Sequence, residues 1–465
     1  MVTVNDFVTP DDIRAMFASA LSEMYRSEVP QYGTLLELVS DVNRRCNQEL
    51  SQDSQHRVEV ERHGAIRLGT TGELHTMRRL FAIMGMHPVG YYDLTVAGLP
   101  VHATCFRPLT REALARNPFR VFTSLLRLDL IDDVDLRSRA DEILSRRDIF
   151  TPRCVELIND LESCPSVPRY KATEFLLEAV EIFRWHKTSM VDMETYQKLR
   201  EAHPLIADVV CFKGPHINHL TPRVLDIEAG QVEMQKRGLK AKTGIEGPPP
   251  RKFPILLRQT SFLALEEEVA FSDGAEKGGK HRARFGEIEQ RGMALTPAGR
   301  SLYDQLISQR LQHVGRGASK QEALANIFED FPDNLESLRK RRLAYFTYKI
   351  ASSNTEVENI GDVDTLVKAG ILSYEPITYE DFLPVSAAGI FHSNLGASFL
   401  QTQRASEDKK AFERGLGCTV KDSFDLYREM EECSITKCLE LLKESSELRN
   451  RTECESDRTD LGFEK

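Results

Sequence analysis

The clearest indication of the fold is the segment VEVERHGAIRL, residues 58–68. Its apolar and polar side chains alternate, with Val58 and Val60 on one face and His63 and Arg67 on the other. This period of two predicts a β-strand with one polar face. His63 and Arg67 are four residues apart, which corresponds to about 13 Å between their Cα atoms in a strand.

The residues after this segment predict a helix and two more strands. The sequence TTGE at 70–73 is a typical helix start, and the helix is expected to continue to about Met86. Strands are expected at 89–94 and 101–106. Together with the first strand, they give a strand–helix–strand order with a histidine on the leading strand.

A similar order returns later in the chain. Residues 205–227 are predicted to be strand, followed by a short helix at about 228–237 and strands at 254–262 and 282–290. Two βαβββ units of this kind, side by side, would form a cupped mixed sheet with the strand-borne polar residues inside. The predicted fold class is therefore α+β.

Helices are predicted around this sheet core. We expect one elaborated domain at 1–440, with its sheet core at about 57–106 and 205–292. Its helical parts are a helical insert at about 110–203 and a helical C-terminal part at about 297–440. The highly charged residues 441–465 form a tail that is a candidate for disorder.

Composition excludes several classes of function. The 465 residues carry a formal net charge of −10, which argues against binding to a phosphate backbone as the main task. No apolar run has the length of a membrane span, and the N-terminus lacks the pattern of a secretory signal. The nine cysteines form no paired CxxC set, which favours reduced thiols in a cytoplasmic protein.

Three segments contain potential metal ligands in a strand-like context: RHGAIR at 62–67, GPHINHLTPR at 214–223 and RFGEIEQRG at 284–292. Together they can supply two histidines and one carboxylate. That set holds a ferrous ion on one face and leaves the other face open for substrate and dioxygen. Arg67 could bind a substrate carboxylate, because its planar guanidinium forms two parallel hydrogen bonds to such a group.

The residues alone leave choices open in each segment. His63 could instead pair with Glu61 on an exposed strand face. In a strand, His216 and His219 point to opposite faces, so at most one is a ligand. Glu287 and Glu289 share a face, and either could be the carboxylate ligand, although such alternating charges are also typical of a solvent-facing strand.

Five segments resemble one known family: RHGAIR, FKGPHINHLTPR (212–223), PILLRQTSF (254–262), RFGEIEQRG and YEDFLPVSAAGIF (379–391). They are similar to the 2-oxoadipate dioxygenase/decarboxylase family, also called hydroxyglutarate synthases. The resemblance extends from about residue 5 to about residue 430. It implies a sheet core of vicinal-oxygen-chelate type wrapped by extensive helices.

The resemblance also implies roles for individual residues. The metal ligands and catalytic residues would be His63, His219 and Glu287. His219 is the later histidine of HINH, and Glu287 is the first glutamate of GEIEQRG. The substrate would contact Arg67, His63 and the backbone of Val385 in the LPVSAAG segment.

The implied activity is an Fe(2+)-dependent conversion of 2-oxoadipate and O2 to 2-hydroxyglutarate and CO2, as part of lysine catabolism. The substrate would serve as its own 2-oxo acid cosubstrate. Two alternatives remain: a metal-dependent isomerase or lyase without redox chemistry, or a non-catalytic globular protein.

Overall fold

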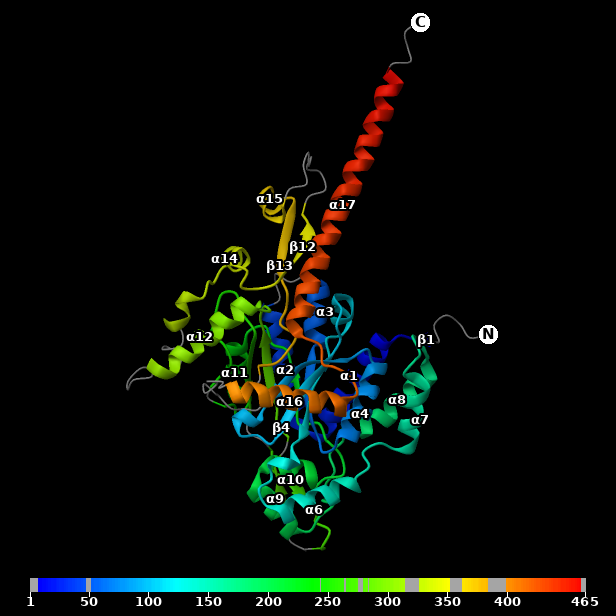
Figure 1. Ribbon diagram of the computed structural model, residues 1–465, viewed down its shortest axis with the longest axis vertical. Coiled ribbons are helices and arrows are strands. Elements are labelled where there is room, and N and C mark those ends of the chain that lie inside the picture. Colours follow the sequence, from blue (N-terminus) through cyan, green and yellow to red (C-terminus); the bar gives the residue numbers. More distant parts are fainter. Residues whose placement is uncertain are drawn as a thin grey trace. The chain divides into compact units, whose positions relative to one another are not determined.

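The computed structural model describes residues 7–46, 52–242, 244–262, 265–274, 279–282, 284–313, 326–351, 362–383 and 399–460. The chain divides into two compact units (Figure 1). Unit 1 comprises residues 1–248, 257–291 and 381–422, and unit 2 comprises residues 249–256, 292–380 and 423–465.

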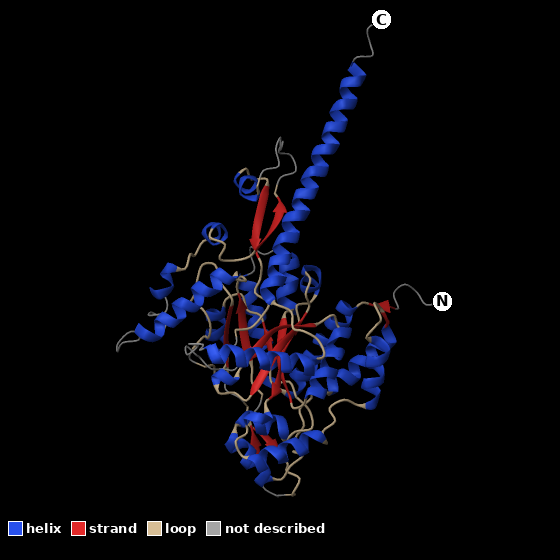
Figure 2. Cartoon of the chain, viewed as in Figure 1, coloured by secondary structure: helices blue, strands red, loops and turns tan. Residues whose placement is uncertain are grey.

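A five-stranded mixed sheet lies at the centre of unit 1 (Figure 2). Its strand order is β3 (His87–Asp93), β4 (Val101–Arg107), β5 (Arg120–Leu126), β2 (Arg62–Leu68) and β7 (Leu220–Pro222). β2 is parallel to β5 and antiparallel to β7, so the sheet contains both kinds of pairing. This arrangement, with helices around it, confirms the predicted α+β class.

A second strand pair continues from the β7 edge. β11 (Glu287–Arg291) is antiparallel to β8 (Leu257–Ser261). A parallel bridge joins Arg223, just after β7, to Glu289, and the Val224 amide donates to the Glu289 carbonyl at 2.7 Å. The ends of β2, β7 and β11 therefore lie next to one another.

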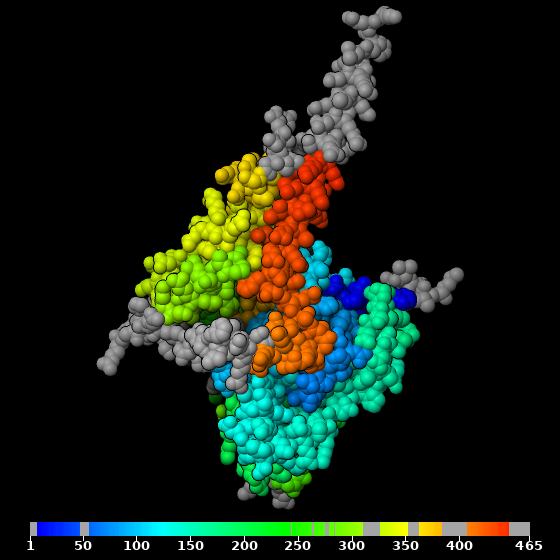
Figure 3. Space-filling view, in the orientation of Figure 1, coloured from blue at the N-terminus to red at the C-terminus, as the bar shows by residue number. Residues whose placement is uncertain are grey.

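Helices surround the strands of unit 1, and α4 begins as predicted. The Thr70 side chain accepts from the Glu73 amide, and the Glu73 side chain accepts from the Thr70 amide, which completes a capping box. α16 packs against α4, and its orange surface lies beside a lighter blue surface in Figure 3. The helices are α1 (Pro10–Glu28), α2 (Pro30–Cys46), α3 (Gln52–Val60), α4 (Thr71–Ile83), α5 (Arg111–Arg116), α6 (Val134–Ser145), α7 (Pro152–Leu161), α8 (Arg169–Glu181), α9 (Met193–Ala202), α10 (Pro204–Val210), α11 (Ile227–Lys236) and α16 (Phe399–Leu416).

Two small strand pairs complete unit 1. β1 (Phe7–Val8) is antiparallel to β6 (Val167–Pro168), and β9 (Glu267–Val269) is antiparallel to β10 (Gly279–His281). The core of the unit is rich in aromatic rings: Phe17 packs edge-on against Phe119 and Phe183, with centroids 5.9 and 5.4 Å away.

Unit 2 contains a strand pair packed on a long helix. β12 (Phe346–Ile350) is antiparallel to β13 (Leu372–Pro376), and β12 packs on α17 (Ser423–Asp460). The Tyr348 amide donates to Ser434 Oγ at 3.0 Å. α17 extends to Asp460, into the 441–465 stretch that was a candidate for disorder. The other helices are α12 (Pro297–His313), α14 (Leu335–Lys340) and α15 (Val363–Lys368).

Two predicted strand segments are partly helical. Val58 and Val60 belong to the end of α3, so the strand begins only at Arg62; two valines are too few to define a period. Most of the apolar stretch 205–212 forms α10, which starts with Pro204 at its first position and is capped by the His203 ring.

The predicted helical regions 110–203 and 297–440 contain strands that the pattern does not reveal. β5 is buried along its whole length, and apart from Arg120 its residues are apolar or small on both faces, so they show no alternation. β12 and β13 are short and lie between helices. Among the described residues, no helix is both long and apolar enough to cross a membrane.

Candidate active site

Three side chains from separate segments meet beside the central sheet of unit 1. His63 comes from β2, His219 directly precedes β7, and Glu287 begins β11. One ligand atom from each lies within 4.8 Å of the other two. Glu287 Oε1 is 3.3 Å from His63 Nε2 and 3.8 Å from His219 Nε2. All three residues are buried.

Backbone packing brings the HINH segment close to β2. Gly64 has no side chain, and a Cβ built there would lie 2.6 Å from Ile217 Cδ1 and 3.3 Å from the His219 carbonyl. Within the sheet, His63 pairs with Thr221 of β7, and the Asn218 amide donates to the Ala65 carbonyl at 3.0 Å. The HINH segment therefore follows β2 closely, and His219 is placed beside His63.

The Glu287 carboxylate is fixed by two further donors. Thr221 Oγ1 and Gln259 Nε2 donate to its Oε1 atom at 3.0 and 2.9 Å. Two imidazoles and one carboxylate of this kind are the ligands of many non-haem iron sites, so the residues present fit a divalent transition metal.

Burial and the nearby carboxylates affect the pKa values of the two histidines in opposite directions. Burial lowers the pKa of His219 to about 4, which keeps its ring neutral and able to coordinate. Burial also opposes the charging of His63, but the Glu289 and Glu287 carboxylates outweigh it and raise the pKa of His63. A cation bound here would interact favourably with the same two carboxylates.

Glu289 lies behind His63 instead of beside Glu287. Its Oε2 atom is 2.9 Å from His63 Nδ1, and its Oε1 atom accepts from Arg291 Nε at 2.9 Å. Burial opposes the ionisation of Glu289, but Arg291 and His63 hold its pKa well below the ordinary value. A carboxylate at this nitrogen fixes the ring so that Nε2 faces Glu287, as is common for metal-bound histidines.

Glu61, the residue that could have paired with His63 on an exposed face, belongs to another cluster. It is fully buried and accepts from Arg120 Nη2 at 2.7 Å and Arg223 Nη1 at 2.8 Å. The two nitrogens of His63 face Glu287 and Glu289.

A cavity of about 420 Å³ opens in front of the three residues. His219 and Glu287 line it together with Arg67, and Lys242 and Glu246 add further charged groups. Its apolar lining includes Phe122, Phe262 and Phe285. A pocket of this size with few charged groups is suited to a small anionic molecule.

Arg67, which lines this cavity, donates from Nη1 to Asp208 Oδ2 at 2.5 Å. The sequence analysis did not identify Asp208, although a carboxylate inside the apolar run LIADVV signals a buried charge that needs a partner. His216 lies 3.2 Å from Asp208 through its Nε2 atom, so the two histidines of HINH face different groups. Val385, the predicted backbone contact for substrate, lies outside the described residues.

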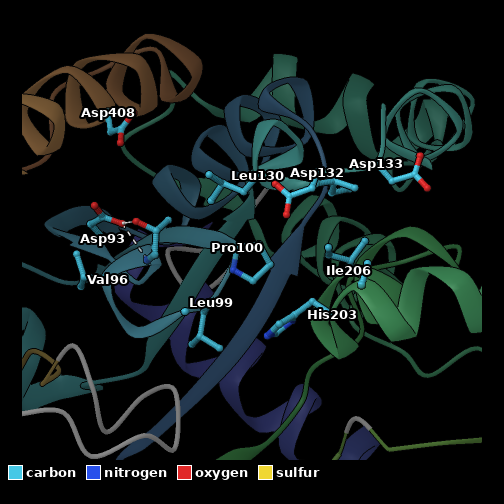
Figure 4. Close-up of a pocket in the computed structure, with 14 residues that line it drawn as sticks. Asp93, Val96, Leu99, Pro100, Leu130, Asp132, Asp133, His203, Ile206 and Asp408 are labelled. Carbon is cyan, nitrogen blue, oxygen red and sulfur yellow. Dashed lines mark hydrogen bonds between the residues drawn. The ribbon is translucent and has the colours of Figure 1, made fainter. Parts of the chain in front are cut away.

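A second cavity of about 630 Å³ adjoins the first (Figure 4). Leu99 and His203 line both cavities. Four aspartates contribute to its lining, among apolar residues such as Leu130 and Ile206: Asp93, Asp132, Asp133 and Asp408.

Comparison with known proteins identifies the family. The sequence profile described as 2-oxoadipate dioxygenase/decarboxylase matches residues 17–394. The chain belongs to this family. A relative named 2-oxoadipate dioxygenase/decarboxylase from Escherichia coli K12 is 53% identical over 446 residues, which cover 93% of this chain and 98% of the relative.

Other members of the family are similar over nearly the whole chain. The relative of the same name from Pseudomonas putida is 49% identical over 456 residues, covering 94% of this chain and 98% of the relative. The crystal structure of the Pseudomonas putida hydroxyglutarate synthase in complex with 2-oxoadipate superimposes with a TM-score of 0.86 at 49% identity. It covers 95% of this chain and 100% of that chain, and the common fold agrees with the α+β class.

Proposed function

We propose that this protein is an Fe(2+)-dependent 2-oxoadipate dioxygenase/decarboxylase that forms 2-hydroxyglutarate and CO2. The observation that carries the proposal is the cluster of His63, His219 and Glu287 in a chain of this family, with a cavity beside it that His219, Glu287 and Arg67 line. When bound, ferrous iron supplies the redox chemistry that activates dioxygen.

The reaction balances without an external reductant. 2-Oxoadipate loses its C1 carboxylate as CO2, C2 becomes a new carboxylate, and the adjacent carbon is hydroxylated. One atom of O2 enters the new carboxylate and the other enters the hydroxyl group. The 2-oxo acid is thus oxidised and hydroxylated in the same molecule, so a second 2-oxo acid is not required.

The side chains of this chain divide the remaining tasks. His63, His219 and Glu287 would hold the metal, and Glu289 orients the His63 ring. Arg67 would bind the substrate carboxylate that is distal to the metal, as its position in the same cavity allows. The aromatic walls would limit the access of bulk water to the reacting carbons.

Oxygen uptake tests this function directly. The protein is reconstituted anaerobically with ferrous iron, mixed with 2-oxoadipate and exposed to ¹⁸O2. We expect stoichiometric O2 uptake and 2-hydroxyglutarate that carries two ¹⁸O atoms. Absence of uptake, with turnover of a 2-oxo acid by the zinc-loaded protein instead, would favour a non-redox isomerase or lyase.

Arg67→Ala tests the substrate contact in the same assay. We expect a rise of about 10- to 100-fold in the KM for 2-oxoadipate, because a charge-assisted contact of about 1.5–3 kcal/mol is lost. Wild-type kinetics in this variant would contradict the assigned role.

The proposed location is the cytoplasm. The eight cysteines whose side chains the structure describes are free thiols, which a reducing compartment favours. Fractionation of the source cells, with disulfide-containing periplasmic or secreted markers as controls, checks this location.

A further inference from the structure

Asp208 connects the proposed substrate arginine to a buried polar cluster. It lies on α10 and is 5% exposed. Its Oδ2 atom accepts from Arg67 Nη1 at 2.5 Å. Arg67 has five N–H donors in a rigid fork, so a partner at Nη1 fixes the plane of the guanidinium and leaves other donors for a second anion.

The other oxygen of Asp208 is held by two histidines. Oδ1 lies 2.9 Å from His281 Nε2 and 3.2 Å from His216 Nε2. His281 Nδ1 in turn lies 2.9 Å from Tyr196 Oη, which continues the cluster to α9. The carboxylate therefore has partners on both oxygens and little freedom to rotate.

Aromatic packing keeps this cluster rigid and dry. Trp185 contacts the His216 ring edge-on, with centroids 4.6 Å apart, and lies parallel to the His281 ring at 6.0 Å. Phe212 packs on His281 at 4.7 Å. Burial opposes the ionisation of Asp208, but Arg67 and His216 outweigh it and hold the pKa of Asp208 well below its ordinary value.

A buried ion pair of this kind contributes little net stability, because desolvation offsets most of the attraction. The main effect of the pair is on geometry. Arg67 lies on a strand and its side chain has four rotatable bonds, and the pair holds this side chain in one position at the cavity wall. Without Asp208, Arg67 would remain charged but would sample several rotamers, and binding a distal carboxylate would require ordering it again.

We propose that Asp208 is a positioning residue that fixes Arg67 for the distal carboxylate and so sets the preference for dicarboxylic over monocarboxylic 2-oxo acids. This inference rests on the proposed function. It assigns selectivity to a residue that does not itself touch the substrate. His281 and His216 support the same arrangement from the opposite side of the carboxylate.

The test compares two substrates that differ only in the distal group: 2-oxoadipate and 2-oxohexanoate. In iron-loaded Asp208→Asn we expect the ratio of kcat/KM for the two substrates to fall about 10- to 100-fold, mainly through the KM for 2-oxoadipate. The constants for 2-oxohexanoate should stay within about twofold of wild type. Asp208→Glu, which keeps the charge, should recover part of the ratio.

A double variant separates positioning from a general structural effect. If Asp208 acts through Arg67, Arg67→Ala combined with Asp208→Asn should have the same substrate ratio as Arg67→Ala alone. Glu73→Gln is the matched control, because Glu73 forms another buried pair with Arg147, at 2.7 Å, and does not line the cavity. It should lower the free energy of unfolding and leave the substrate ratio unchanged.

Two outcomes would overturn the inference: an unchanged ratio in folded, metal-loaded Asp208→Asn, or equal loss for both substrates. If Asp208→Asn does not fold, His281→Gln removes one support of the carboxylate and should lower the ratio by a smaller factor; an unchanged ratio there would also overturn it. Calorimetric binding of both acids to the anaerobic protein gives the same comparison without turnover. Binding measured in this way tests the role of Asp208 even without turnover, whereas the proposed function is contradicted if the wild-type protein consumes no O2.

Discussion

His216 and His219 lie three residues apart, but the structure gives them different neighbours. His219 faces Glu287 and His63, whereas His216 faces Asp208 and Trp185. The sequence analysis also allowed at most one ligand between them, but on the assumption of a regular strand, whereas both histidines precede β7 and lie outside any strand.

We expect His219→Ala to lose bound iron and turnover, since one of three proposed ligands is removed. His216→Ala should retain iron and show only weakened kinetics. Metal analysis of the purified variants after anaerobic reconstitution measures this difference. Equal loss of metal from both would contradict the ligand assignment.

Glu289 provides a second prediction at the residue scale. In Glu289→Gln the carboxylate facing His63 Nδ1 becomes a neutral amide, and we expect metal affinity to fall about 10- to 100-fold while all three ligands remain. Competition with a chromogenic chelator measures this affinity. Glu73→Gln, at a buried pair with Arg147 that is not part of the metal cluster, should leave this affinity unchanged.

Some of these residues could be identified from the sequence and others could not. The period of two placed His63 and Arg67 on one polar strand face, and the family resemblance selected His219 and Glu287. Asp208 was missed because its partners come from segments distant in sequence, Arg67 and His281. The role of Val385 stays a prediction.

At the scale of elements, β2 carries both a proposed metal ligand and the proposed substrate arginine. The about 13 Å between the Cα atoms of His63 and Arg67 is set by the rise of the strand, which cannot adjust to a shorter ligand. We therefore expect 2-oxoglutarate, which is one methylene shorter than 2-oxoadipate, to have a kcat/KM lower by about 10- to 200-fold. Steady-state oxygen uptake with both acids measures the ratio, and equal values would exclude this role of β2.

β4 provides a prediction about pH and stability through His102. The ring is buried against Phe412 of α16, with centroids 4.7 Å apart, and lies 3.3 Å from Tyr91 Oη. Burial and the nearby Arg127 together lower the pKa of His102 to about 4, although Asp408 opposes the change. The unfolded chain therefore binds a proton here at higher pH than the folded protein does.

Because the unfolded chain binds the proton more readily, the free energy of unfolding decreases as the pH falls. As the pH falls from about 6.5 to about 4, the His102 contribution destabilises the fold by up to about 1.4 kcal/mol per pH unit, and it levels off below that range. We expect His102→Gln to reduce the loss of unfolding free energy between pH 6.5 and 4.5 by about 2 kcal/mol. Urea unfolding at several pH values measures it, and parallel curves for both proteins would contradict the prediction.

Elements with local signals were predicted well, and elements defined by tertiary burial were not. The capping box at Thr70 correctly indicated α4, and β2 lies within the predicted strand 58–68, although it begins only at Arg62. β5 lies between β4 and β2 in the centre of the sheet, where both faces are buried, so its sequence has no strand period. α10 was mistaken for a strand because a short apolar run fits either structure.

At the scale of the whole molecule, neither compact unit is one continuous stretch of chain. The chain passes from one unit to the other after residues 248, 256, 291, 380 and 422. A unit assembled from several segments requires distant parts of the chain to be ordered together, which favours cooperative folding. The proposal of a single catalytic domain at 1–440 has the same consequence.

We therefore expect one calorimetric transition, with equal calorimetric and van't Hoff enthalpies, for the full-length protein. Loss of O2 uptake on heating should follow the same curve. Two resolved transitions, with uptake lost in only one of them, would show that the units unfold separately and would contradict the single domain.

The partition between the two cavities matters for the design of chemical probes. Among the residues that the structure describes, only Leu99 and His203 are common to both linings, so an inhibitor with a metal-chelating head could carry a tail past them. The second cavity presents Asp132 and Asp133 (Figure 4), which would favour an amine at the end of that tail. Such a compound would be longer than a six-carbon acid, and its affinity would include contacts with the second cavity.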